Sequence, residues 1–312
     1  MPLNKFIFLK KDIKLIGWSG NLTNIVSSHS YLDFFIIIIK RSFLSLCRKK
    51  KDIIYYRYLN TNRIFFNEAL ILIFDILIFF QALLGLIELR WIIHNIDKET
   101  IDRFPLFTLI KKKILLKIST KKYVLDEILV KSANTIYNCC DIIPISFGKP
   151  IIEIETNKSI LNEIKLFRKK KLLVGISSCW VNKSEGVHDL IIKTLNAKKN
   201  TVIFYLGIPF DFEHPRLIKF KTKLNFNVND FDFCLKSLND LSIPATLYNC
   251  AFYKKPLIYD DCSIFGELVN EFELGCNINM IREYNFEPIL DKQIDNFFKK
   301  RNWTLAREKL FK

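Results

Sequence analysis

The sequence predicts an α/β protein with two domains, each built on a parallel sheet. Short apolar runs typical of buried strands alternate along the chain with longer helical patterns, and such alternation indicates parallel β-α-β units. The alternation occurs twice, with a basic helical pattern and a charge run at 158–171 between the two stretches. The length of 312 residues, half of them hydrophobic, is sufficient for two ordinary domains with real cores.

The first half of the chain contains the first of these stretches. Residues 52–59 (DIIYYRYL) read as a strand, 63–87 as a helix, and 90–95 (RWIIHN) as a strand that ends in a polar loop. A short helix is expected at 123–131 and a further strand at 133–137. These elements form the expected N-terminal domain.

The second half repeats the pattern around apolar strands and amphipathic helices. The predicted strands are 172–177, 201–206, 231–235 and 256–259, and the predicted helices are 187–198, 244–252, 264–274 and 291–312. Ligands of open parallel sheets bind at the carboxyl ends of the strands, so the loops after residues 95, 177, 206 and 235 are the expected binding loops. We expect two Rossmann-like domains facing a cleft, 1–168 and 169–290, with helices at 291–312 that pack back toward the N-terminal domain.

Two hydrophobic segments raise the question of a membrane. Residues 69–87 are long enough to span a bilayer, and only Asp75 and Gln81 interrupt them. At about 100° per residue, the polar positions between Arg63 and Glu88 fall within one arc of about 160°. That arrangement favours a core helix with its apolar side on the sheet, and residues 31–46 behave similarly. An interfacial helix that touches lipid and a true span are the alternatives.

The amino-acid composition and the positive net charge indicate which kinds of molecule this protein binds. The chain has 48 Lys and Arg against 32 Asp and Glu, which predicts an anionic partner such as nucleic acid, a phosphorylated substrate or anionic lipid. The aromatic residues lie in apolar core patterns rather than among basic residues, which argues against nucleic acid. The basic run Arg48–Lys51 fits membrane contact or a solvated helix end.

Cysteine and histidine usage argues against a protein-bound metal. The eight Cys include no CxxC pair and the four His are widely separated, so we expect no metal site and a reducing cytoplasm. Residues 1–14 lack the features of a signal peptide.

His94 and Asn95 end an apolar strand, which places them at the ligand edge of the predicted sheet. Histidine can act as an acid or base near neutral pH, and asparagine can bind hydroxyls. A following carboxylate, Asp97 or Glu99, could serve as general base toward a hydroxyl acceptor. The alternative is that His94 only caps the strand with a backbone hydrogen bond.

The segment from Gly175 to Gly186 is a strand, a small-residue loop and a helix start. Such a segment can hold a diphosphate, because backbone N–H groups and the helix dipole attract anions. Ser177 and Ser178 lie in it, and Lys183 would neutralise charge. It contains neither GxxxxGK[ST] nor GxGxxG.

A second candidate phosphate cradle lies at the predicted helix start formed by Ser242, Pro244, Ala245 and Thr246. Proline suits the first turn of a helix, and a Ser or Thr there lies among the free N–H groups. Glu267 could accept two hydroxyls of a sugar or ribose; the alternative is an ordinary surface carboxylate at a helix start.

Together these motifs resemble GT-B glycosyltransferases of the family 4-like group, with some similarity to the β-1,4-mannosyltransferases of lipid-linked oligosaccharide assembly. The resemblance covers about residues 50–290. It is carried by the strand 52–59, the W-x-x-H-N ending of 90–95, LLVGISSCW at 172–180, IPATLYNCAFYKKPLI at 243–258 and the ELV of 266–269. Thr246 stands where the group usually has Lys. Ser177 and Glu185 stand nearest to its diphosphate-binding Arg and Lys, which leaves Lys183 as a substitute.

The resemblance implies transfer of a sugar from a nucleotide-sugar donor to a hydroxyl of a membrane-linked glycan or polysaccharide precursor, with no cofactor and no metal. His94 and Asn95 would face the transferred sugar, Lys183 and the helix start at 242–246 would hold the diphosphate, and Glu267 would hold donor hydroxyls.

The expected location is the cytoplasm, at the inner face of an anionic membrane, because the first 60 residues carry 11 Lys and Arg against 3 Asp. A catalytically degenerate partner subunit of a glycan-assembly complex is the alternative function.

Overall fold

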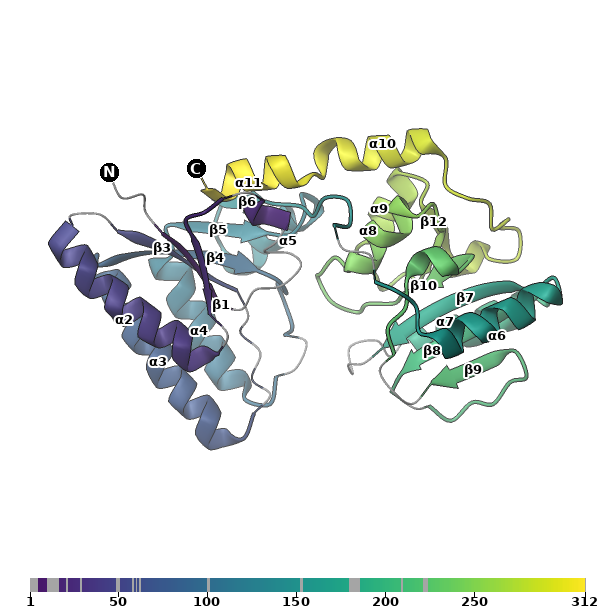
Figure 1. The fold of residues 1–312 in the computed structure, drawn as a ribbon, viewed down its shortest axis with the longest axis horizontal. Helices are drawn as coiled ribbons and strands as arrows, with labels where there is room; N and C mark the ends of the chain where they lie inside the picture. The colour runs from purple at the N-terminus through teal and green to yellow at the C-terminus, as the bar shows by residue number, and fades with distance from the viewer. Residues whose placement is uncertain are drawn as a thin grey trace. The chain divides into compact units, whose positions relative to one another are not determined.

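Two six-stranded sheets, in which every described strand pairing is parallel, form the framework of the chain. The computed structural model describes residues 5–9, 17–20, 22–28, 30–48, 51–57, 59, 61, 63–99, 102–151, 154–179, 186–208, 210–220 and 224–311. The chain divides into unit 1, Met1–Ser146 with Trp303–Lys312, and unit 2, Phe147–Asn302. The predicted α/β class with two parallel sheets is confirmed (Figure 1).

The sheet of unit 1 has the strand order β2-β1-β3-β4-β5-β6. Its strands are β1 (Phe6–Leu9), β2 (Ile25–Ser28), β3 (Asp52–Tyr56), β4 (Ile87–Ile93), β5 (Lys121–Val124) and β6 (Ile142–Pro144). Its helices are α2 (Tyr31–Arg48), α3 (Phe65–Leu83), α4 (Pro105–Ile118), α5 (Ile128–Tyr137) and α11 (Trp303–Phe311).

Opposite faces of this sheet carry different helices. From β2 onward the chain crosses to the next strand in one direction, so right-handed connections place α2, α3 and α4 on the same face (Figure 1). The other face carries α11, where the ring of Phe311 lies 4.7 Å from that of Phe6 and 5.9 Å from that of Tyr55. The Tyr55 hydroxyl and the Arg90 guanidinium both donate to the carbonyl of Leu310.

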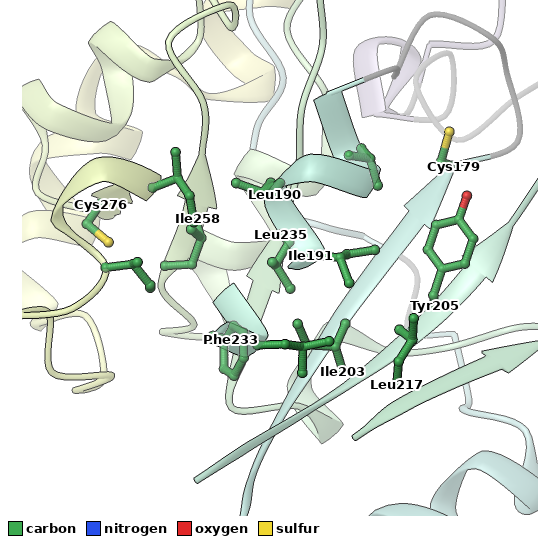
Figure 2. Packing of buried hydrophobic residues seen from close by; sticks show 14 residues of the cluster. Cys179, Leu190, Ile191, Ile203, Tyr205, Leu217, Phe233, Leu235, Ile258 and Cys276 are labelled. Atoms are coloured by element: carbon green, nitrogen blue, oxygen red, sulfur yellow. The ribbon is translucent and has the colours of Figure 1, made fainter. Parts of the chain in front are cut away.

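The sheet of unit 2 has the strand order β12-β11-β10-β7-β8-β9. Its strands are β7 (Leu173–Cys179), β8 (Thr201–Gly207), β9 (Leu217–Phe220), β10 (Phe233–Leu235), β11 (Leu257–Tyr259) and β12 (Gly275–Asn277). Its helices are α6 (Lys158–Lys169), α7 (Gly186–Ala197), α8 (Ala245–Phe252), α9 (Gly266–Glu271) and α10 (Asp291–Lys300). Figure 2 shows the core that α7 forms on this sheet, with Ile191 close to Ile203, Phe233 and Leu235.

Two sequence predictions in unit 1 are wrong. Residues 121–124 form β5 and 128–137 form α5, in place of a helix at 123–131 and a strand at 133–137. Leu129 and Ala133, one helical turn apart, are both buried, so the packing of this helical face outweighs the strand propensity of the local β-branched residues.

The boundary between the two units differs from the expected one. The expected domain boundary at 168 lies inside α6, whereas the units divide between Ser146 and Phe147 and again after Asn302.

The polarity of α3 is also the reverse of the prediction. Glu68 and Asp75, expected on the outer side, are completely buried, and the apolar side of the helix is exposed. The inversion has a local cause: Asp75 pairs with Lys111 of α4 at 2.9 Å and accepts a hydrogen bond from Tyr31 of α2. Among the described residues α3 is the helix long and apolar enough to cross a membrane, with 28% of that window buried.

Candidate functional site

The carboxyl end of β4 in unit 1 positions His94 and Asn95. The strand is buried over its last residues, and His94 is buried directly after it. The Asn95 amide Nδ2 donates to Glu99 Oε2 at 3.2 Å, and Lys112 Nζ of α4 lies 3.2 Å from Glu99 Oε1. Asn95 and Glu99 therefore meet at the turn that follows His94, with Glu99 held between an amide and an ammonium group.

Asp97 lies on the same turn in a different environment, because its side chain is exposed. The turn is fastened by Tyr137 of α5, whose hydroxyl donates to the carbonyl of Ile96 at 2.6 Å. Burial raises the pKa of Tyr137, and the charges of Glu99 and Asp97 add to the effect, so this hydroxyl stays protonated. Of the two predicted carboxylates, Asp97 is the accessible one and Glu99 is the one that orients Asn95.

Two charged residues that were not among the predicted site residues flank this turn. Arg57 follows β3 and Asp126 follows β5, the two neighbours of β4 in the sheet, and both are buried. The Arg57 guanidinium carbon lies 5.7 Å from the centre of the Phe8 ring. For Arg57, a charged residue directly after the apolar run of β3 is a signal in the sequence, whereas Asp126 comes two residues after the strand KKYV and has no such signal. In the sequence, Arg57 falls within the predicted strand 52–59 and Asp126 within the predicted helix 123–131.

In unit 2 the predicted serines lie at the carboxyl end of β7. The buried Ser177 hydroxyl donates to the carbonyl of Leu235 at 3.2 Å, which joins β7 to β10. The carbonyl of Ser178 accepts a hydrogen bond from Lys236 Nζ at 3.1 Å. Burial lowers the pKa of Lys236, although neighbouring acidic groups oppose the shift. Lys236 is not among the predicted site residues, although it directly follows the apolar run of β10.

The N-terminus of α7 meets the ends of β10 and β11. A Cβ added to Gly186, the first residue of α7, would lie 2.3 Å from Asp260 Oδ2 and 2.5 Å from Ser237 Oγ. Ser237 is fully buried, and its hydroxyl has no hydrogen-bond partner in the described part of the chain. Asp260 Oδ1 accepts from the Ser263 hydroxyl at 2.7 Å. A glycine, an uncommitted buried hydroxyl and the Asp260 carboxylate thus converge at a helix N-terminus. The N-terminal dipole, the free N–H groups and the Ser237 hydroxyl attract an anion, and the Asp260 carboxylate opposes this attraction. The predicted Lys183 lies outside the described residues.

The second predicted cradle begins α8, where Pro244 is the extended residue before the helix and Ala245 is exposed in its first turn. The Ser242 hydroxyl donates to Asp240 rather than to the helix, and Thr246 is half-buried. Glu267, in the first turn of α9, has an exposed side chain. Residues 242–246 follow β10 and Glu267 follows β11, so they come after the carboxyl ends of strands in the same sheet as Ser178.

Solved structures resemble the whole chain, although comparison of the sequence with protein-family models and with curated proteins found no match. HepE of Anabaena in complex with UDP-glucose superposes with a TM-score of 0.61 at 11% identity, over 98% of this chain and 97% of that one. Sucrose-phosphate synthase from Thermosynechococcus elongatus gives a TM-score of 0.60 at 9% identity, over 99% and 98%. A co-structure of S. aureus MnaA with UDP gives 0.52 at 10% identity, over 99% and 95%.

The chain has the GT-B fold. The fold predicted by the motif resemblance is therefore confirmed.

Within the GT-B fold the predicted residues separate into two sets. His94, Asn95, Asp97 and Glu99 lie at the end of β4 in the N-terminal unit. The described donor-site residues lie at the ends of β7, β10 and β11 in the C-terminal unit. Within the described residues no group of three or more His, Cys, Asp or Glu side chains is arranged to hold a metal ion.

Proposed function

We propose that this GT-B protein is a glycosyltransferase that moves a sugar from a nucleotide-sugar donor to a hydroxyl of a membrane-linked glycan or polysaccharide precursor. One observation carries the proposal: the buried Ser237 hydroxyl, without a partner among the described residues, at the N-terminus of α7 beside Gly186. It occurs in a chain with the fold of HepE, whose structure holds UDP-glucose.

The donor diphosphate would lie at the N-terminus of α7. The helix dipole and backbone N–H groups attract it, Ser237 donates a hydrogen bond, and Lys236 and the predicted Lys183 neutralise charge. The helix start at 242–246 offers a second set of N–H groups, and the exposed carboxylate of Glu267 accepts hydroxyls of the sugar or ribose. These groups need no cofactor or metal to stabilise the leaving diphosphate.

The acceptor would meet the end of β4, where His94 and Asn95 face the transferred sugar. In an inverting reaction, the acceptor oxygen bonds to the anomeric carbon as the bond to the diphosphate oxygen breaks, and the acceptor proton passes to a carboxylate base. We assign the base to Asp97, because its side chain is exposed whereas Glu99 is paired with Lys112. The leaving group departs as the nucleoside diphosphate.

The proposed location is the cytoplasm, peripherally bound at the inner face of the membrane, and the proposed partners do not include nucleic acid. The bias of 11 Lys and Arg against 3 Asp in the first 60 residues suits a pyrophosphate-bearing acceptor in an anionic leaflet. A degenerate partner subunit is the second candidate function. It is favoured by Thr246 in place of Lys, and by Ser177 and Glu185 nearest to the usual basic pair.

A thermal-shift panel of UDP, GDP, CMP and their sugar conjugates tests the donor site. A ligand at 100 times its Kd adds about 2.7 kcal/mol of stability. We expect one nucleotide to raise the Tm, and the shift to shrink in Ser237→Ala, Lys236→Ala and Lys183→Ala. Lys199→Ala is the matched control, because Lys199 is exposed just before β8, at the amino ends of the strands and therefore away from the proposed donor site. No shift with any nucleotide would favour the degenerate subunit.

A further inference from the structure

The helix layer α2–α4 of unit 1 exposes an apolar surface. Residues of α3 project most strongly, with Phe66 73%, Ile73 54% and Phe80 56% exposed. The exposed large apolar residues of α3 and its ends are Ile64, Phe65, Phe66, Leu70, Ile73, Ile76, Leu77, Phe80, Leu83 and Leu84. A row of this size is uncommon on a soluble surface and marks an interaction site.

The neighbouring helices extend this surface on both sides. In α2, Leu32, Ile36, Ile39 and Phe43 are exposed and fall within about 60° of one another around the helix axis. In α4, Leu106 and Leu109 share one exposed stripe. All three helices cover the same face of the sheet, and α3 contacts both α2 and α4, so the stripes form one surface, here called the α2–α4 face.

Polar groups lie beneath this face instead of on it. Asp75 of α3 and Lys111 of α4 are buried on the inner side of the helix layer, where they form an ion pair of 2.9 Å. Tyr31 donates to the same carboxylate, and its hydroxyl lies 2.6 Å from that of Tyr56 in β3. These partners come from α2, α4 and the sheet, so they fix the rotation of α3 about its axis. The outward direction of its apolar side is therefore built into the fold.

Basic residues accompany the α2–α4 face. The stripe of α4 continues from Leu106 and Leu109 into Lys113 and Lys117, both exposed, and α4 contains no acidic residue. Lys40 is exposed beside the stripe of α2. Both acidic residues of α3 are buried. An apolar centre with cations beside it matches the acyl boundary and headgroups of an anionic bilayer. A two-fold dimer through this face would instead bring identical lysines together.

We propose that the α2–α4 face inserts into the interface of an anionic phospholipid bilayer without crossing it. A crossing is disfavoured because α3 links the adjacent parallel strands β3 and β4, so both of its ends return to one sheet. The inference deepens the proposed function, since it names the surface that would bring the protein to a membrane-borne acceptor. It needs no catalytic activity, so it can be tested separately.

Flotation with vesicles of 70:30 phosphatidylcholine and phosphatidylglycerol tests the proposal on the full chain. We expect Phe66→Ser/Ile73→Ser/Phe80→Ser to lower vesicle binding at least tenfold. The control is Leu166→Ser/Met280→Ser/Leu290→Ser, which removes three exposed apolar residues of unit 2 and should bind like the wild type. Equal binding of the α3 variant and the wild type would overturn the proposal.

A second variant covers the case in which the triple α3 variant does not fold. Lys113→Glu/Lys117→Glu changes only exposed residues and should lose binding to the anionic vesicles. Ile73→Trp should show blue-shifted emission on vesicle addition and quenching by brominated lipids. Absence of both effects would contradict insertion, and so would resistance of the wild type to alkaline carbonate extraction, which would indicate a span.

Light scattering and nucleotide binding separate the remaining outcomes. A wild-type dimer that the α3 variant dissociates, together with no vesicle binding, would assign the α2–α4 face to a second copy and overturn the proposal. The nucleotide thermal shift should be unchanged in the α3 variant, because the proposed donor site lies in unit 2. Loss of vesicle binding with a retained shift supports the membrane surface. Vesicle binding without any nucleotide shift would count against the proposed function alone.

Discussion

Asp97 and Glu99 are two residues apart on one turn, but their side chains meet different surroundings. Asp97 is exposed, whereas Glu99 is buried between Asn95 and Lys112. If Asp97 is the base, Asp97→Asn should lower kcat by about 10²- to 10⁴-fold with little change in stability. Glu99→Gln should instead lower the free energy of unfolding by about 3 kcal/mol, because Lys112 loses its charged partner. Transfer kinetics and urea denaturation of both variants check this, and the reverse pattern would exchange the two roles.

The cysteines provide a prediction that depends on pH. Burial raises the pKa of Cys276 to about 12, so roughly one molecule in ten thousand carries the thiolate at pH 8. The thiolate is the reactive form. A maleimide at pH 8 should therefore modify the exposed Cys140 and Cys262 quickly, and leave Cys276 and Cys250 unmodified until the protein is unfolded. Peptide mass spectrometry after timed labelling measures this; rapid modification of folded Cys276 would contradict the structure.

For the individual residues, sequence patterns located part of the candidate site. His94 and Asn95 follow a clear apolar strand, so their place at a sheet edge could be predicted. Ser237 could not be singled out, because its interest depends on the approach of Gly186 from a distant segment. Ordinary serines after strands are common, and only the tertiary contact distinguishes this one.

In the helix layer, the ion pair of Asp75 and Lys111 is one of the buried contacts that fix the rotation of α3. Asp75→Ala should lower the free energy of unfolding by about 3–5 kcal/mol, because Lys111 would remain buried without its partner. The double variant Asp75→Leu/Lys111→Met removes both charges and should recover most of that loss. Denaturant unfolding of the three proteins gives the comparison. A double variant as unstable as the single one would show that the charges themselves are required.

This element also shows why a helical pattern alone was insufficient. The positions of the polar residues on one arc of α3 were predicted, but the arc was assigned to the outside. The direction of an amphipathic helix follows from its partners, and here these partners are Lys111 on α4 and Tyr31 on α2. Neither pairing can be recognised from local periodicity. The same holds for α5, where two buried residues outweighed local strand propensity.

The whole molecule depends on a long-range return of the chain. The last helix, α11, belongs to unit 1 although it follows the whole of unit 2. Leu310 is fully buried there, so Leu310→Ala should lower the free energy of unfolding by about 2–5 kcal/mol. Tryptophan fluorescence during denaturation should report this loss, because Trp18, Trp91 and Trp303 all belong to unit 1. An unchanged midpoint would mean that α11 does not stabilise unit 1.

The two-sheet architecture was the most predictable property of the whole molecule. Strand-helix alternation is repeated over long stretches, so the α/β class and the second sheet followed from it. The first two strands were not predicted, because four-residue runs such as Phe6–Leu9 lack a detectable period. Their place at one edge of the sheet is set by pairing with β3, which lies far along the sequence.

Sugar transfer by this protein is tested most directly with a labelled donor and membranes. The purified protein is incubated with inverted membrane vesicles and the radiolabelled sugar conjugate of the nucleotide that raises its Tm. We expect label in the lipid-extractable or polymer fraction, abolished in Asp97→Asn and reduced in Ser237→Ala. A donor that binds tightly but transfers no label to any membrane fraction would contradict catalysis and leave the degenerate partner subunit as the function.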